Sequence, residues 1–488
     1  MNFRAIIYIL GWILNIEGAF MLLPFIVSLI YKEPQGIAYL MVSVLCIILG
    51  CITVMRKPKN MVFFEKESLV TVSFGWILLS IFGALPFYFT KEIPSFTNAL
   101  FETVSGFSTT GASILSRPED LSYASLFWRS FTNWLGGMGV LVFLLAITPL
   151  TKGGSPIYLL RAESPGPSVE RLFPKLQSTA LVLYVMYIAL TVLEFIFLIL
   201  GKMPVFDAIT ASFATAGTGG FSIKSTGFAE YSPYIQWVVA TFMMLFGINF
   251  GMYFLLILKK WKKAVMYEEV RYYIGVIIIA TAIIFFNIYP SIENVSDALR
   301  HSFFQVSSII TTTGFSSTDF NLWPTASKTI LVFLMFVGAC AGSTGGGMKI
   351  SRIMVLFKTV KKELMICIHP GTVKKIKVEG KAITHEVQRS ITAFFIAYML
   401  LFVISVLIIS FENHDIVTTF TSVVATIGDI GPGLEKIGPT GNFAFFSPLS
   451  KYVLMFNMLA GRLELYPLLA LLQLSMWKSA FKKKNPNI

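Results

Sequence analysis

The sequence predicts an all-α integral membrane protein in which two N-terminal helices precede four repeats, each made of a long helix, a short helix with a glycine segment, and a second long helix. Three observations predict it. Hydrophobic residues make up 55% of the 488 residues and charged residues only 13%, whereas a soluble domain carries about a quarter charged residues. Many apolar stretches reach the roughly 20 residues that a helix needs to cross a bilayer. A short amphiphilic stretch ending in glycine recurs four times between them.

The two leading helices are expected over residues 5–31 and 37–55, within an N-terminal segment 1–60. The first contains Glu17 and Pro24 and has no small-residue cleavage site, so we interpret it as a retained helix and not as a signal peptide. The apolar stretches are too long for barrel strands and do not alternate. Helices are therefore the expected spans.

The four repeats are assigned to residues 61–150, 151–260, 261–360 and 361–488, the last of which includes a basic cytoplasmic segment. Their long, short and long helices are expected over 69–90, 97–108 and 127–150; 178–201, 205–217 and 232–258; 272–290, 297–311 and 325–357; and 389–412, 415–427 and 446–478.

The short stretches resemble one another in their residues. Each opens with an Asn or Asp that is a good helix N-cap, namely Asn98, Asp207, Asp297 and Asp415. Each ends at a glycine: Gly111, Gly220, Gly314 and Gly431. Residues 101–113 read FETVSGFSTTGAS, 304–316 FQVSSIITTTGFS and 215–222 TAGTGGFS, and the most divergent copy, 425–433, reads ATIGDIGPG. The recurrence favours four copies of one structural unit over four unrelated loops.

The charge distribution indicates the topology. Most of the 39 Lys and Arg fall in one alternating set of loops, which places these loops in the cytoplasm. The basic segments are Arg56-Lys57, Lys152 to Lys175, Lys259 to Lys263, Lys358 to Lys381 and the tail Lys482 to Lys484. The net charge of +13 thus reports topology and contact with membrane lipid. No nucleic-acid binding is expected, since no aromatic-rich surface accompanies the charge.

The repeated unit indicates a path for cations. The short helices cannot span the membrane, and the topology directs their C-termini, which carry the negative end of the helix dipole, toward the bilayer centre. Non-helical backbone at that depth is tolerated where it lines a water-filled path, and its carbonyls can replace the hydration shell of an ion. The hydroxyls of Thr109, Thr110, Thr312 and Thr313 add oxygens. Because the nearest acids (Glu102, Asp207, Asp297, Asp429) are few, a monovalent alkali cation is favoured over calcium.

Two further motifs complete the pattern. The glycine segments, the two leading helices, GACAGSTGGGMKISR (338–352) and AGRLELYPLL (460–469) resemble the TrkH family of potassium-uptake subunits, in the Trk/Ktr/HKT superfamily. The resemblance implies a pseudo-fourfold pore, potassium as the transported ligand and no cofactor in this chain. It also implies a homodimer in the bacterial inner membrane with a cytoplasmic, nucleotide-binding partner of the TrkA type. Filter roles carry over to Thr110-Gly111, Gly219-Gly220, Thr313-Gly314 and Ile430-Gly431, while Gly428 and Asp429 leave the register of the fourth copy open.

A gate is expected on the inner side of the filter. The cluster Gly342-Ser343-Thr344-Gly345-Gly346-Gly347 should break the second helix of the third repeat. In the resembling family this segment is a loop that obstructs the pore; the alternative is a plain turn at the cytoplasmic exit. Arg462 lies inside the last helix and should face the pore or this loop, or else bind backbone carbonyls as a structural arginine. Glu464, two residues on, does not share its face.

Three functional classes compete. A gated potassium pathway is favoured, and an ion-coupled potassium symporter, driven by sodium or protons with alternating access, is the alternative because broken helices are typical of that class. A membrane enzyme would need convergent acid, base or metal-binding residues, which the sequence does not present. The basic run 358–388 is the expected docking surface for the cytoplasmic partner.

Overall fold

The computed structural model describes residues 1–488 except 59–63, 140–175, 293, 372–374 and 482–488. The expected all-helical class is confirmed: the one sheet in the described part is a hairpin of β1 (Lys377–Val378) and β2 (Lys381–Ala382). Six described helices are long and apolar enough to cross a membrane, or seven if one bent pair counts as a span. The end of the helix expected over 127–150, the basic segment Lys152 to Lys175, Lys374 and the tail Lys482 to Lys484 lie outside the described residues.

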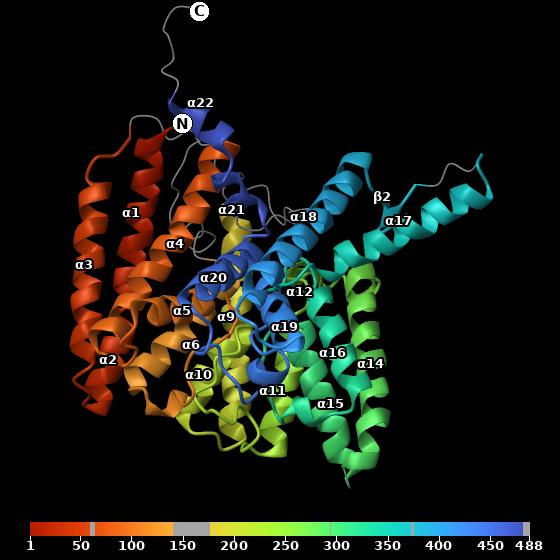
Figure 1. Ribbon diagram of the computed structural model, residues 1–488, viewed down its shortest axis with the longest axis horizontal. Helices are drawn as coiled ribbons and strands as arrows, with labels where there is room; N and C mark the ends of the chain where they lie inside the picture. Colours follow the sequence, from red (N-terminus) through yellow and green to blue (C-terminus); the bar gives the residue numbers. More distant parts are fainter. Residues whose placement is uncertain (59–63, 140–175, 293, 372–374, 482–488) are drawn as a thin grey trace, which may run out of the picture.

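The leading helices are α1 (Phe3–Phe20), α2 (Leu22–Tyr31) and α3 (Gly36–Val54). Together α1 and α2 make one apolar span of 29 residues with a joint at Met21. Pro24 explains the joint, because a proline cannot donate to the carbonyl four residues earlier, here Phe20, and its ring crowds that carbonyl. α1 packs along α3 and α4, on the outer side of the first repeat (Figure 1).

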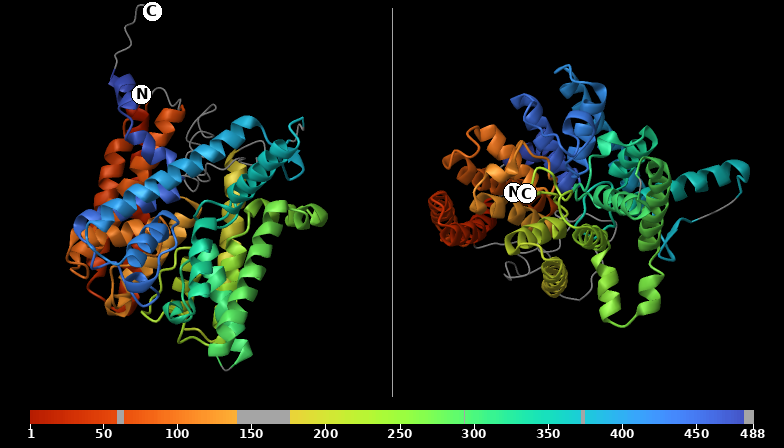
Figure 2. Two further views of the ribbon diagram at one scale, coloured as in Figure 1. Left: turned by 45° about the vertical axis from the view of Figure 1, so that its right-hand side comes forward. Right: turned by 90° about the horizontal axis from the view of Figure 1, so that it is seen from below.

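Four long helices open the repeats, close to their expected positions. They are α4 (Glu65–Phe89), α9 (Leu176–Leu200), α14 (Glu268–Ile288) and α18 (His385–Ser410). Seen from below, the four repeats follow one another around a common centre in chain order (Figure 2, right). Short connecting helices join the elements: η1 (Pro118–Asp120), α13 (Trp261–Val265), η2 (Tyr289–Ser291), η3 (Phe320–Leu322) and η4 (Glu435–Ile437).

Three of the four second long helices are seen to break, and the expected end of the first lies outside the described residues. The first is α6 (Tyr123–Met138). The others are split into α11 (Pro233–Phe246) and α12 (Phe250–Ile257); α16 (Thr325–Val337) and α17 (Ile350–Ile368); and α20 (Pro448–Arg462), α21 (Tyr466–Leu471) and α22 (Leu474–Phe481). The expectation of continuous helices over 232–258 and 446–478 was therefore wrong, and α11 and α12 meet at 91°.

The breaks have local causes. α16 ends at Gly338, whose φ of 75° a helix cannot continue, so the break expected at 342–347 spans the whole segment 338–349. α20 ends before Glu464 and Leu465, which both have positive φ. Pro467 follows, and it has no N–H for the carbonyl of Leu463. Backbone groups freed by these breaks need partners elsewhere in the membrane interior.

The four short helices lie between the long helices of their repeats. They are α5 (Phe96–Phe107), α10 (Val205–Ala216), α15 (Val295–Ile310) and α19 (Ile416–Ile427). Of the expected N-caps only Asp415 is correct, accepting a hydrogen bond from the Thr418 N–H at 2.7 Å.

The other three helices begin earlier, and the expected caps were wrong. Asn98, Asp207 and Asp297 lie at the third helical position. Pro204 and Asn294 precede two of these helices, and either residue can start a helix. An acid in the first turn still faces the positive helix end, and Asp207 also accepts from the Tyr231 hydroxyl at 2.8 Å.

Candidate cation pathway

The four short helices end in the same backbone motif. The N–H groups of Thr110, Gly219, Thr313 and Ile430 each donate to the carbonyl five residues earlier at 2.9 Å. This bond is the signature of the Schellman motif, in which the preceding residue adopts the left-handed conformation. That residue is Thr109, Thr218, Thr312 and Asp429 in the four repeats, with φ of 60°, 52°, 60° and 56°. The equivalence fixes the register that the sequence left open: Asp429-Ile430-Gly431 matches Thr312-Thr313-Gly314.

Left-handed backbone is strained for three of these four residues. A β-branched side chain with positive φ is an outlier, whereas Asp tolerates the conformation better. Such strain persists only where the surroundings impose it, and it concentrates at functional sites. Sequence reasoning missed Thr218 and the strain at this position. Aligning the four copies on their last glycine would have found Thr218, whereas the strain is visible only in the backbone angles.

The glycine segments form a closed ring. A Cβ added to Gly111 would collide with the carbonyl oxygen of Gly219, one on Gly220 with that of Thr313, and one on Gly314 with that of Ile430. A Cβ on Gly431 would lie 2.7 Å from the carbonyl oxygen of Thr110. The fourth repeat therefore contacts the first, and the ring is closed. Each of the four glycines has φ between 68° and 98°. The structure thus brings all eight expected carbonyl-and-glycine positions together around one axis.

The threonine hydroxyls at this ring bind protein atoms. Thr109 donates to the carbonyl of Ser108 at 2.6 Å, and Thr313 lies 2.8 Å from the Thr311 hydroxyl. Thr312 accepts from the Gly346 N–H at 2.7 Å. Thr110 donates to the Asp429 carboxylate at 3.0 Å. All four threonine hydroxyls therefore form hydrogen bonds within the protein. The ring itself is defined by the backbone carbonyls and the glycines that they contact.

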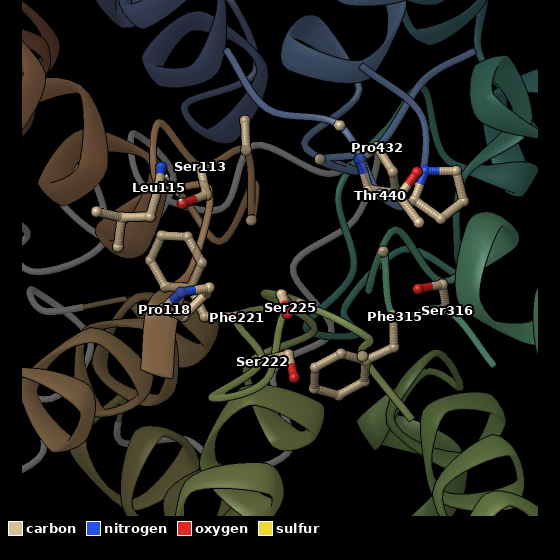
Figure 3. A pocket seen from close by; sticks show the side chains of 18 of the residues that line it. Ser113, Leu115, Pro118, Phe221, Ser222, Ser225, Phe315, Ser316, Pro432 and Thr440 are labelled. Carbon is tan, nitrogen blue, oxygen red and sulfur yellow. Dashed lines mark hydrogen bonds between the residues drawn. The ribbon is translucent and has the colours of Figure 1, made fainter. Parts of the chain in front are cut away.

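A polar hollow opens on the outer side of the ring (Figure 3). Its floor contains the four ring glycines, and its wall carries hydroxyl groups of Ser113, Ser222, Ser225, Ser316 and Thr440. Glu119 steadies the wall by accepting from the Ser225 hydroxyl at 2.8 Å. Partial burial acts to raise the pKa of Glu119, but its hydrogen bonds from Ser225 outweigh this and hold the pKa below its usual value.

A buried ion pair contacts the residues that follow the ring glycines in the first two repeats. Sequence reasoning missed this pair. Arg129 of α6 lies 2.7 Å from Glu102 of α5, and both side chains are almost fully buried. Glu102 also accepts from the Ser113 hydroxyl and the Ile114 N–H, just beyond Gly111. Arg129 donates to the Ser222 carbonyl in the second repeat at 3.2 Å. The pair therefore joins the outer ends of two neighbouring repeats.

The segment 338–349 crosses the inner side of the ring. Its Gly346 contacts Thr312 through the hydrogen bond described above, and a Cβ there would lie 2.8 Å from the Gly428 carbonyl. On the other side, the Cys340 N–H donates to the Gly247 carbonyl, and the Phe250 N–H donates to the Gly342 carbonyl. These bonds satisfy backbone groups freed where α11 and α12 part. The segment is thus a folded loop packed against three repeats, in contrast to a plain turn at the helix exit.

Arg462 points at this loop. It donates to the Thr344 carbonyl at 2.9 Å and to the Gly136 and Gly137 carbonyls at the end of α6, the latter at 2.6 Å. The sequence offered several positions for Arg462, among them facing the loop and binding backbone carbonyls. The structure combines these two, because one of the carbonyls that the arginine binds belongs to the loop. Glu464, which was expected not to share the helix face of Arg462, pairs with Arg352 of α17.

The chain matches one known family over most of its length. A family model described as a cation transport protein, TrkH, matches residues 38–483. The chain belongs to the TrkH family. TrkH-family relatives include the Trk system potassium uptake protein TrkH of Salmonella typhimurium, 38% identical over 98% of this chain and 100% of the relative. The TrkG protein of Escherichia coli is 32% identical over 98% of this chain and 99% of that protein.

A solved structure agrees with the fold. The crystal structure of the potassium transporter TrkH from Vibrio parahaemolyticus superimposes with a TM-score of 0.87 at 33% identity, covering 98% of this chain and 100% of the other. The family, the apolar helices and this likeness make the chain a multi-pass protein of the inner membrane.

Proposed function

We propose that the chain takes up potassium across the bacterial inner membrane through a gated, channel-like pore whose filter is the ring of backbone carbonyls. The ring of glycine segments carries this proposal. Four short helices direct their negative ends to one axis, and the carbonyls of Thr110, Gly219, Thr313 and Ile430 lie against the glycines of the neighbouring repeats. Carbonyl oxygens held in this way substitute for the water around a cation.

Potassium is the ion that the relatives' names give. Salmonella TrkH and Escherichia coli TrkG are both called potassium uptake proteins. Neutral carbonyl oxygens suit a monovalent alkali cation, and the ring glycines leave no side chain in the way. Transport is the proposed role in preference to catalysis.

The gate of this proposal is the loop 338–349 together with Arg462. Residues 342–347, which the sequence singled out, include Gly346, which contacts Thr312 at the ring. Because the loop packs on the ring's inner side, an ion could pass only if the loop moved. The hydrogen bond from Arg462 to Thr344 favours the position seen here.

The proposal includes partners. A second copy of this chain and a cytoplasmic, nucleotide-binding TrkA-type subunit complete the system, and the basic segment 358–388 is the docking surface. Its helix α17 starts where the loop ends, so a partner that moved α17 would move the loop. This coupling is a hypothesis based on continuity in the chain.

Ion flux from proteoliposomes tests the function. Potassium and rubidium should pass faster than sodium and lithium, and uptake should follow the potassium gradient after the sodium and proton gradients are removed. Uptake that stops when either of those gradients is removed would instead support the symporter. Equal flux of all four ions, in protein shown to be folded, would overturn the carbonyl filter.

A further inference from the structure

Asp429 differs from its counterparts in the other repeats. The equivalent residues are Thr109, Thr218 and Thr312, so Asp429 is the single carboxylate at this level of the ring. It is fully buried. One oxygen, Oδ1, accepts from the Thr110 hydroxyl at 3.0 Å. The other, Oδ2, has no hydrogen-bond partner among the described residues.

The loop 338–349 and the end of α20 both lie close to Oδ2. A Cβ on Gly346 would lie 3.2 Å from Oδ2, and a Cβ on Gly461 would lie 2.9 Å from it. The backbone of two glycines therefore lies close to this oxygen. Because Gly346 belongs to the loop, a movement of the loop would remove one of these two neighbours of Oδ2.

Two cationic side chains act on Asp429, and both bind the loop. Arg462 and Lys349 are near enough to influence its charge. However, Lys349 donates to the Gly345 carbonyl and Arg462 to the Thr344 carbonyl. Three consecutive loop residues thus lie beside charged side chains: Thr344 beside Arg462, Gly345 beside Lys349 and Gly346 beside Asp429. When the loop leaves, Lys349, which ends the loop, leaves with it, and the carboxylate loses part of the positive charge that offsets it.

A buried carboxylate without a full set of partners is costly unless a cation or proton supplies the missing interaction. We propose that Asp429 is the ligand of an inner cation site at the cytoplasmic end of the filter, which the loop 338–349 covers in the present arrangement and uncovers when it moves. The site takes an alkali cation during transport and holds a divalent cation of similar size, such as barium, more strongly, because a carboxylate attracts two charges more than one. This proposal rests on the proposed function.

The test compares barium block of rubidium flux in three proteins: the parent chain, Asp429→Asn and Asp429→Thr. The Asn variant keeps an acceptor for Thr110 and removes only the charge, and the Thr variant places the residue of the other three repeats. Asp120→Asn is the control, since Asp120 is an exposed carboxylate outside the ring. Barium is added on both faces, and each protein is also made without residues 343–346, so that the site is open.

The concentration for half block should rise tenfold or more in both Asp429 variants, most clearly in the shortened chain, and stay unchanged in Asp120→Asn. Equal block in parent and variants would overturn the inner site; a carboxyl group that holds a proton in place of a cation would give this result. Thermal unfolding of the purified proteins with barium needs no flux, and barium should stabilise the shortened parent more than its Asp429→Asn form. Absence of flux from every folded protein would overturn the proposed function, while this binding difference would still decide the site.

Discussion

Glu379 and Glu268 bind each other's backbone. A carboxylate oxygen of Glu379, at the tip of the cytoplasmic hairpin, accepts from the Glu268 N–H at 2.7 Å, and Glu268 accepts from the Glu379 N–H at 3.2 Å. Glu379 thereby caps the start of α14. The next residue, Glu269, accepts from the Ala341 N–H of the loop at 2.7 Å. A continuous series of contacts therefore runs from the hairpin through the start of α14 to the loop.

This series predicts that Glu379→Ala raises basal rubidium flux. Loss of a helix cap costs about 1 kcal/mol, and the freed start of α14 would hold Glu269 and the loop less firmly. Glu386→Ala is the matched control, because Glu386 is an exposed acid in the first turn of α18. If flux through Glu379→Ala equals that of the control at matched protein levels, the hairpin does not restrain the loop.

A second prediction concerns the hydrogen bond from Arg462 to Thr344. A hydrogen bond to a charged group contributes about 1.5–3 kcal/mol, so Arg462→Gln should shift the loop toward release and raise basal flux about tenfold. The measurement is rubidium uptake into proteoliposomes. Arg117→Gln, which removes an exposed arginine outside the ring, should leave uptake unchanged. Uptake that falls in Arg462→Gln would show that the arginine supports conduction.

The third prediction uses the ring glycines. Replacing Gly111, Gly220 or Gly314 by Ala places a Cβ against the carbonyl of the next repeat and forces it to turn, so the ratio of potassium to sodium flux should fall. Gly275→Ala is the control, since a Cβ there meets nothing within 4 Å. An unchanged ratio in all three ring variants would contradict the filter assignment.

The buried pair of Glu102 and Arg129 should matter for stability. Removing one partner leaves an uncompensated buried charge, which costs about 3–5 kcal/mol. Glu102→Gln should therefore lower the unfolding temperature in detergent. Glu230→Gln breaks an ion pair with Lys224 whose Glu230 side chain is 55% exposed, and should have no measurable effect. Equal unfolding temperatures for the two variants would show that the Glu102–Arg129 pair does not stabilise the fold.

The last prediction distinguishes cytoplasmic lysines that would contact the partner from Lys358, which stabilises the hairpin. Lys358 bonds to Glu268 and to the Lys377 carbonyl, so its loss would disturb the hairpin itself. Neutralising Lys361, Lys362, Lys375 and Lys381, while keeping Lys358, should weaken capture of a TrkA-type partner in a pull-down. Undiminished capture, together with undiminished ligand control of flux, would exclude this surface.

The membrane class, the two leading helices, the four repeats and the glycine at the end of each short helix were all predicted from the residues alone. Long apolar runs and repeated glycines are local properties, so they can be read from the chain. The resemblance to the TrkH family, which the family model confirms, rests on such local motifs. Three of the four expected N-caps were wrong, because the start of a helix depends on which upstream residue, such as Pro204, begins it.

The relations between the repeats, in contrast, became visible in the folded protein. Gly428 and Asp429 left the register of the fourth copy open in the sequence, and it was decided by the left-handed backbone that Asp429 shares with three threonines, which adopt it against their own preference. Likewise, nothing in the chain pairs Glu102 with Arg129, and the sequence offered the loop as only one of several surroundings for Arg462 before the structure joined it to Thr344. These contacts join segments up to 118 residues apart, and they form because charges and backbone groups buried in the membrane interior must find partners there.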